Sequence, residues 1–171
     1  DDSLGVSQNI DVISEKDDGT YTALQEKIEN ASEGSTITLE NDYCINHQIE
    51  ISKPLTILGN AHSINITTST IIFNICSDGV ILENINFDTV IYSSGNAVRH
   101  VGDVAISLKG NNCSIIDCTF SDYVADKGGA IYLDGNDCSV INCIFKNNKA
   151  HQGGAIYLNG NNCSVINCTF T

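Results

Sequence analysis

The sequence of 171 residues predicts an all-β fold. The expected architecture is a right-handed parallel β-helix, with about 25 residues per coil and a short N-terminal capping α-helix. Three similar lines recur at equal spacing: "ISLKGNNCSIIDCTF" from 106, "IYLDGNDCSVINCIF" from 131 and "IYLNGNNCSVINCTF" from 156. Gly and Asn clusters divide each line into short apolar pieces that are too short for helices, and no two-residue hairpin turn joins neighbouring pieces. Three short strands per unit are typical of one coil of a parallel β-helix.

The repeat extends upstream with weaker similarity, because residues 73–87 and 55–57 align with the later coils. This alignment predicts four columns of side chains that point into the core. They are Leu55/Val80/Cys113/Cys138/Cys163, Ile57/Leu82/Ile115/Val140/Val165, Ile85/Cys118/Cys143/Cys168 and Phe87/Phe120/Phe145/Phe170.

Six of the eight cysteines occupy two of these columns, and the earlier coils place Leu, Val or Ile at the same positions. A metal ligand could not be exchanged for valine, whereas a free cysteine behaves as a small buried hydrophobe. The C-x4-C spacing also differs from that of zinc sites. We therefore expect core-filling thiols at Cys113, Cys118, Cys138, Cys143, Cys163 and Cys168, and neither a metal nor another cofactor. Stacked coils lie about 4.8 Å apart, so disulfides between neighbouring coils stay open as an alternative.

Asn and Gly recur where the strands turn. Asn84, Asp117, Asn142 and Asn167 align at one bend, where we expect a ladder of side chains that satisfies the backbone. The turns at 110–112, 135–137 and 160–162 are expected to do similar work, because Gly and Asn accept a positive φ at low cost.

Three segments are expected along the chain. Residues 1–19 form a tail or first strand, residues 20–34 a capping helix, and residues 35–171 the coils. In the helix, Tyr21, Leu24, Ile28 and Ala31 share one face, Thr22 and Gln25 form a capping box, and Gly34 ends the helix.

The last coil has no polar cap of the kind that repeat proteins need. We therefore expect this chain to be the N-terminal part of a longer protein.

The net charge of −13 argues against nucleic-acid partners, and no apolar run is long enough to insert in a membrane.

Two places on the predicted surface are candidates for ligand binding. Tyr132 and Tyr157 are one coil apart and face outward by alternation, so they could cover a sugar ring or pack on a protein. Eight extra residues within 88–105 form an insertion that contains Arg99, His100, Tyr92 and Asp103. Insertions in repeat proteins often lie on the binding face. The alternatives are an aromatic pair that only steadies the sheet and a tolerated surface loop.

The "GGAI" at 128–131 and 153–156, with "FKNN" at 145–148, resembles the GGAI/FxxN repeats of chlamydial polymorphic outer-membrane proteins. The order of "GTYTALQEKIENASEGSTITLENDY", "IEISKPLTILGN" and Asn/Cys-rich coils resembles the adhesin-like surface proteins of methanogenic archaea. This resemblance covers residues 18–171, and "FSDY" at 120–123 departs from the FxxN pattern. It implies an extracellular, cell-surface location. The anaerobic life of methanogens would suit free thiols.

These observations favour a non-enzymatic, adhesin-like module that binds a carbohydrate or protein on another cell surface. A passive stalk is one alternative, with self-association end to end or face to face through the outward row Ile116/Ile141/Ile166. A polysaccharide lyase or hydrolase is the other, because such enzymes share the fold, although the acidic residues do not recur on neighbouring coils. Asn30 and Asn65 are the glycosylation candidates.

Overall fold

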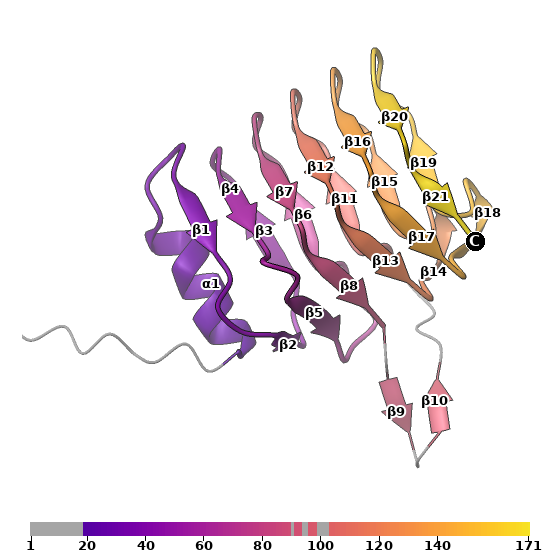
Figure 1. Cartoon of the computed structure of the whole chain (residues 1–171), viewed down its shortest axis with the longest axis horizontal. Helices are drawn as coiled ribbons and strands as arrows, with labels where there is room; N and C mark the ends of the chain where they lie inside the picture. The colour runs from indigo at the N-terminus through magenta and orange to yellow at the C-terminus, as the bar shows by residue number, and fades with distance from the viewer. Residues whose placement is uncertain (1–18, 90, 94–95, 99–102) are drawn as a thin grey trace, which may run out of the picture.

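The computed structural model describes residues 19–89, 91–93, 96–98 and 103–171 as a β-solenoid of about 5 turns that repeats about every 25 residues (Figure 1). One short helix precedes the strands. The predicted parallel β-helix with an N-terminal helix is therefore confirmed. The predicted tail, residues 1–19, lies almost wholly outside the described residues.

Three parallel sheets run along the solenoid, and each is named here after its first strand. The β1 sheet contains β1 (Thr36–Thr38), β4 (Thr56–Leu58), β7 (Ile81–Glu83), β12 (Ser114–Ile116), β16 (Ser139–Ile141) and β20 (Ser164–Ile166). The β2 sheet contains β2 (Tyr43–Ile45), β5 (Ser63–Ile66), β8 (Asn86–Asp88), β13 (Thr119–Ser121), β17 (Ile144–Lys146) and β21 (Thr169–Phe170). The β3 sheet contains β3 (Ile49–Ile51), β6 (Phe73–Ile75), β11 (Ile106–Leu108), β15 (Ile131–Leu133) and β19 (Ile156–Leu158).

Two shorter pairings complete the strands. β14 (Val124–Lys127) pairs with β18 (Lys149–Gln152) in parallel, between the β2 and β3 sheets of their coils. β9 (Ile91–Ser93) and β10 (Asn96–Val98) form an antiparallel hairpin. This hairpin projects from the body of the solenoid between β8 and β11 (Figure 1), which is where the sequence predicts an insertion.

The core is made of columns of identical or similar side chains because like residues meet in register on neighbouring strands. Phe87 pairs with Phe120, Phe120 with Phe145 and Phe145 with Phe170. Their rings stack with centroids 4.9, 5.1 and 5.0 Å apart. The first three rings are buried, whereas Phe170 on the last strand is 53% exposed.

The capping helix α1 (Tyr21–Asn30) covers the first coil with Leu24 and Ile28, which are both buried. The predicted capping box is wrong. The residue before the helix is Thr20, in an extended conformation, and its hydroxyl accepts a hydrogen bond from the main-chain N–H of Ala23. Thr22 therefore already lies in the first turn. Gln25 donates to Glu29 on the next turn and does not reach back to the N-terminus.

The helix also ends earlier than predicted. Its last residue is Asn30, and Ala31 is extended. The side chain of Lys53 donates hydrogen bonds to the carbonyls of Glu29 and Ala31, which lack partners within the helix. Gly34 has a φ of +74° in the following turn, where its N–H donates to the carbonyl of Pro54.

The hydrogen-bonded ladder of side chains does not lie at the bend where the sequence analysis first predicted it. Asn84, Asp117, Asn142 and Asn167 are exposed and serve as left-handed corners, with φ of 56°, 53°, 54° and 52°. The hydrogen-bonded ladder runs through Asp78, Asn111, Asn136 and Asn161. Each of the three asparagines donates through its main-chain N–H and its amide to the side-chain oxygen of the residue before it in the ladder.

The glycines of these Gly-Asn turns allow neighbouring coils to approach. A Cβ atom on Gly135 would lie 1.9 Å from the carbonyl oxygen of Gly110, and one on Gly160 would lie 1.8 Å from that of Gly135. Glycine is therefore required for stacking. A later residue in each turn, Asn112, Asp137 or Asn162, has a positive φ, as predicted. The turn glycines do not adopt a positive φ and serve the close approach of the coils instead.

Candidate functional site

The outward face of the β3 sheet carries a row of side chains from consecutive coils. The strand register aligns Glu50, Asn74, Ser107, Tyr132 and Tyr157. In β15 the flanking Ile131 and Leu133 are buried in the core while Tyr132 is half-buried. The structure thus places both predicted tyrosines on the outer surface, at the end of this row.

The two tyrosines form a stacked pair. Their ring centroids lie 5.3 Å apart and the ring planes differ by 11°. The ammonium group of Lys127 lies 5.1 Å from the centroid of the Tyr157 ring. A cation at this distance is attracted to the ring by about 0.5–1 kcal/mol at an exposed site. Ring stacking therefore restrains both tyrosines, and Lys127 also restrains Tyr157.

A groove of about 230 Å³ lies beside Tyr132. Its lining residues come from the segment before β6, the segment before β11, β11 itself, β14 and β15. They are Ile71, Asp103, Val104, Ser107, Ala125, Asp126, Lys127 and Tyr132. Three of these are aliphatic, two are acidic and one is basic, so the groove offers both an apolar wall and hydrogen-bonding groups. Pockets of such mixed character are typical of small-ligand sites.

A buried polar part of the same row adjoins the groove. Ser107 is 5% exposed and Asn74, its neighbour in register, is 9% exposed. The side-chain oxygen of Asn74 is buried, and no hydrogen-bond partner for it is found among the described residues. An amide oxygen in this state costs free energy, so its presence here needs an explanation beyond packing.

The two binding candidates in the insertion lie outside what the structure describes. Arg99 is not among the described residues, nor is its neighbour His100, and the side chain of Tyr92 in β9 is likewise undescribed. Asp103, which follows the insertion, is exposed and lines the groove. The structure therefore brings two residues of the 88–105 segment, Asp103 and Val104, to the groove beside Tyr132.

The cysteines follow the predicted columns. Cys113, Cys118, Cys138 and Cys143 are buried, Cys163 and Cys168 are half-buried in the last coil, and all eight are free. The thiol of Cys138 donates to the carbonyls of Gly110 and Asn136, each at 3.3 Å. Burial raises the pKa of this thiol to about 11. It therefore stays protonated at neutral pH and is a poor nucleophile.

The same holds for Cys113, whose pKa is raised mainly by burial. The pKa of Cys118 is raised by its hydrogen bond with Cys143 and by burial. No group of three or more His, Cys, Asp or Glu side chains suited to a metal ion is found in the described part of the chain. Cys113, Cys118, Cys138 and Cys143 lie within the hydrophobic core cluster, and Cys163 and Cys168 pack against it.

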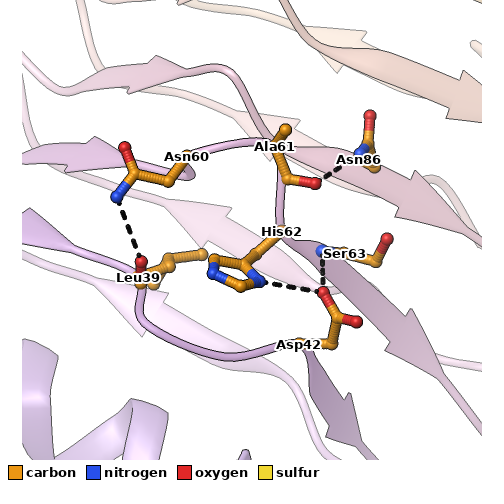
Figure 2. A network of polar contacts seen from close by, with 7 residues as sticks. All are labelled: Leu39, Asp42, Asn60, Ala61, His62, Ser63 and Asn86. Carbon is orange, nitrogen blue, oxygen red and sulfur yellow. Dashed lines mark hydrogen bonds and ion pairs between the residues drawn. The ribbon is translucent and has the colours of Figure 1, made fainter.

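A histidine–aspartate pair joins the first two coils just before β2 and β5 of the β2 sheet (Figure 2). Nδ1 of His62 lies 3.1 Å from a carboxylate oxygen of Asp42, which also accepts the main-chain N–H of Ser63 at 2.8 Å. The hydroxyl of Ser63 points away from the His62 ring (Figure 2). This geometry offers no serine nucleophile to the histidine, so the pair serves as a link between coils.

Two more bonds support this corner, one between the first and second coils and one between the second and third coils. The amide of Asn60 donates to the carbonyl of Leu39 at 3.5 Å, and that of Asn86 donates to the carbonyl of Ala61 at 2.8 Å (Figure 2). Asn60 and Ala61 have positive φ values of 51° and 62°. Side chains from neighbouring coils therefore hold a tight corner in place.

The glycosylation candidates differ in exposure. Asn30 is exposed at the end of α1, whereas Asn65 is half-buried in β5. A glycan on Asn30 would meet less steric resistance than one on Asn65, and both stay predictions.

A family model described as the Chlamydia polymorphic membrane protein (Chlamydia_PMP) repeat matches residues 142–159. This stretch includes Phe145 and Asn148 of the FxxN pattern and the second GGAI. Asn148 accepts the N–H of Tyr123 and donates to the carbonyl of Phe120, both at 3.0 Å, so the motif fastens one coil to the preceding one. No curated protein and no solved structure matches the chain.

The match supports a chlamydial-type repeat in a β-solenoid, which fits a surface adhesin-like module. Within the residues that the structure describes, no helix is long and apolar enough to cross a membrane.

Proposed function

We propose that this chain is an extracellular, adhesin-like module of a cell surface that binds a carbohydrate or protein partner through the outward face of the β3 sheet. The observation that carries the proposal is the stacked pair of Tyr132 and Tyr157 beside a groove. The family match at residues 142–159 supports it, because it relates the coils to repeats of a polymorphic membrane protein family.

Exposed tyrosines are suited to this role. A tyrosine ring offers a large apolar surface with little loss of side-chain freedom, and its hydroxyl can form hydrogen bonds with a partner. Here stacking and Lys127 limit the movement of the rings before any partner arrives. Such preorganisation lowers the entropic cost of binding.

The buried thiols add an expectation about the setting. Free cysteines are rare in oxidising extracellular environments, so the protein is expected to work where oxygen is scarce. This would suit the surface of a methanogenic archaeon, the source of the adhesin-like proteins that the sequence resembles.

An adhesion assay tests the proposal. Fluorescent beads coated with the chain would be applied to glycan-coated, protein-coated and cell surfaces. Tyr132→Ala/Tyr157→Ala should abolish most of the retention of the beads, whereas Ile116→Ala/Ile141→Ala, an outward pair on the β1 sheet, should not. Loss of bead retention by the Ile116→Ala/Ile141→Ala variant would indicate that the β1 sheet carries the binding face. Failure of the unaltered chain to bind any surface would favour the passive stalk.

The enzyme alternative has one observation in its favour, because the groove brings Asp103 and Asp126 together with Lys127. Hydrolysis of glycosidic bonds requires a pair of carboxyl groups. A reducing-sugar assay on pectin, alginate and plant fibre, with Asp103→Asn and Asp126→Asn as controls, tests it. Release of sugar that depends on both acids would replace the binding proposal with a hydrolase or lyase.

A further inference from the structure

The outer row of the β3 sheet is interrupted at Ser107. Tyr157 stacks on one face of the Tyr132 ring. Since the register pairs Tyr132 with Ser107 on its other side, the second face of the ring is directed along the solenoid toward the serine. Ser107 has too small a side chain to cover it. The groove beside Tyr132 is therefore the place where the next ring of the column would lie.

The size of the groove suits one ring. Its volume of about 230 Å³ is below the roughly 300–1,000 Å³ of pockets that hold drug-sized ligands. Ile71, Val104 and Ala125 supply apolar lining. A ligand that continues the column thus needs a flat apolar face toward Tyr132 and apolar contact at its edge.

The polar groups show what else the ligand must carry. Carboxylates accept hydrogen bonds, a lysine donates them, and a serine hydroxyl does both. Asp103, Ser107, Asp126 and Lys127 line the groove. Several acceptors in one small groove favour a ligand that is rich in hydroxyl groups. An aromatic side chain would leave most of them without partners.

The charges of the groove disfavour an acidic ligand. Two aspartates and one lysine leave the groove negative, in a chain whose net charge is −13. Like charges brought together on binding raise the free energy of the complex. A uronic or sialic acid is therefore disfavoured relative to an uncharged sugar.

We propose that this groove binds one neutral pyranose ring of a glycan, with the C–H face of the sugar on the free face of Tyr132 and its hydroxyl groups on Asp103 and Asp126. This inference rests on the proposed function, since it names the partner of the same face. In this proposal the small side chain of Ser107 leaves room for the sugar ring on the free face of Tyr132.

Saturation-transfer NMR with the whole chain tests the proposal. The probes are methyl galactoside, methyl mannoside and N-acetylglucosamine as neutral sugars, glucuronic acid as the acidic sugar, and N-acetyltyrosinamide as a substitute for an aromatic side chain of a protein. We expect signals from at least one neutral sugar and a weaker or absent signal from glucuronic acid.

Ser107→Tyr is the decisive variant, because its ring would occupy the proposed place of the sugar. It should lower the affinity for the neutral sugar at least tenfold. Ser164→Tyr makes the same change on the outward face of the β1 sheet and should leave the affinity unchanged. Asp103→Asn and Asp126→Asn should each weaken binding about tenfold, since a neutral amide is a poorer acceptor than a carboxylate. Circular dichroism verifies that each variant folds.

Three results would overturn the inference. They are binding of N-acetyltyrosinamide without any neutral sugar, stronger binding of glucuronic acid than of the neutral sugars, and full sugar binding by a folded Ser107→Tyr variant. The absence of any sugar signal while coated beads still adhere through Tyr132 and Tyr157 would refute the sugar and leave the adhesin function in place. If adhesion also failed, the proposed function would fall with it.

Discussion

Two columns of stacked aromatic rings run along the solenoid, one inside it and one on its surface. The inner column passes from Phe87 to Phe170 without a break, whereas the outer column contains Tyr132 and Tyr157 and stops at Ser107. The ring spacing is nearly the same, 5.1 Å between Phe120 and Phe145 and 5.3 Å between the tyrosines. What differs is burial, so stacking alone does not reveal which column stabilises the fold and which meets a partner.

The two columns differ in that the outer one lacks a ring at Ser107. A missing ring inside the solenoid would leave a cavity, and cavities in a core are costly. A missing ring on the surface leaves a groove that water can fill at little cost. The inner position is therefore filled in the second coil as well, where the buried Ile64 stands in register with Phe87. The outer column can lack a ring at Ser107 without leaving a cavity in the core.

The largest expected effect is on the inner column. Phe120→Ala should lower the free energy of unfolding by about 3–5 kcal/mol, because Phe120 is fully buried between Phe87 and Phe145. Tyr132→Ala should cost less, because Tyr132 is only half-buried, although it also loses an aromatic pair worth about 0.5–1.5 kcal/mol beyond the buried area. Urea denaturation monitored by circular dichroism compares them. Equal losses would contradict the division between the columns.

A polar column on the outside should show an intermediate effect. The side chain of Asn136 bonds to both Asn111 and Asn161. Its replacement by Ala removes these bonds and leaves the main-chain N–H of Asn161 without its acceptor, so we expect a loss of about 1–3 kcal/mol. Asn142→Ala is the matched control, because Asn142 lies at an exposed corner of the same coil. This residue has a positive φ, which alanine adopts less readily than asparagine, so the substitution should cost only this backbone preference. A larger loss for Asn142 would contradict the assignment of the ladder.

The reactivity of the thiols distinguishes the buried cysteines of the core from the exposed ones, and no mutation is needed. Under nitrogen, a thiol reagent at pH 7 should react rapidly with the exposed Cys44 and Cys76 and slowly with Cys138, since burial raises the pKa of the Cys138 thiol to about 11. After denaturation, eight thiols should react. A denatured count below about four would show that disulfides join the coils, in conflict with the packing role of the cysteines.

The smallest expected effect concerns pH and the link between the first coils. Hydrogen bonds from the N–H of Ser63 and from His62 lower the pKa of Asp42. The folded state therefore binds the Asp42 proton less tightly than the unfolded state does. The resulting stabilisation is present above the pKa of an unfolded aspartate, about 3.9, and is lost as the pH falls through the lowered value.

Asp42→Asn tests this pH dependence. The unfolding midpoint of the unaltered chain should exceed that of the variant at pH 7, and the difference should shrink toward pH 2. A difference that does not change with pH would show that the carboxylate charge has no part in the link.

The columns could be predicted from sequence because a constant repeat length brings identical side chains to adjacent strands. That regularity predicts the Phe column, the Tyr pair and the burial of the cysteines in the central coils. It could not predict the groove, because Ile71, Asp103 and Asp126 come from separate segments and the insertion interrupts the repeat between two of them. One signal is visible: "ISL" at 106–108 stands where the next two coils read "IYL".

The errors at the ends of the helix have a local cause. The stretch "TYTAL" offers two threonines that could precede the helix, Thr20 and Thr22. The structure selects Thr20, since a helix that begins at Tyr21 places Leu24 and Ile28 on the first coil. At the other end Lys53, distant in sequence, caps the carbonyls. Tertiary contacts therefore decide boundaries that local patterns leave open.

If the inner rings hold the solenoid together and the outer rings bind the partner, as proposed, the two sets of rings should respond to different measurements. One experiment on Phe120→Leu and Tyr132→Leu tests this claim, with unfolding free energy and retention of coated beads measured for both. We predict that Phe120→Leu loses stability but, while folded, keeps its retention, and that Tyr132→Leu keeps most of its stability but loses retention. Unchanged retention of the Tyr132→Leu beads would contradict the claim.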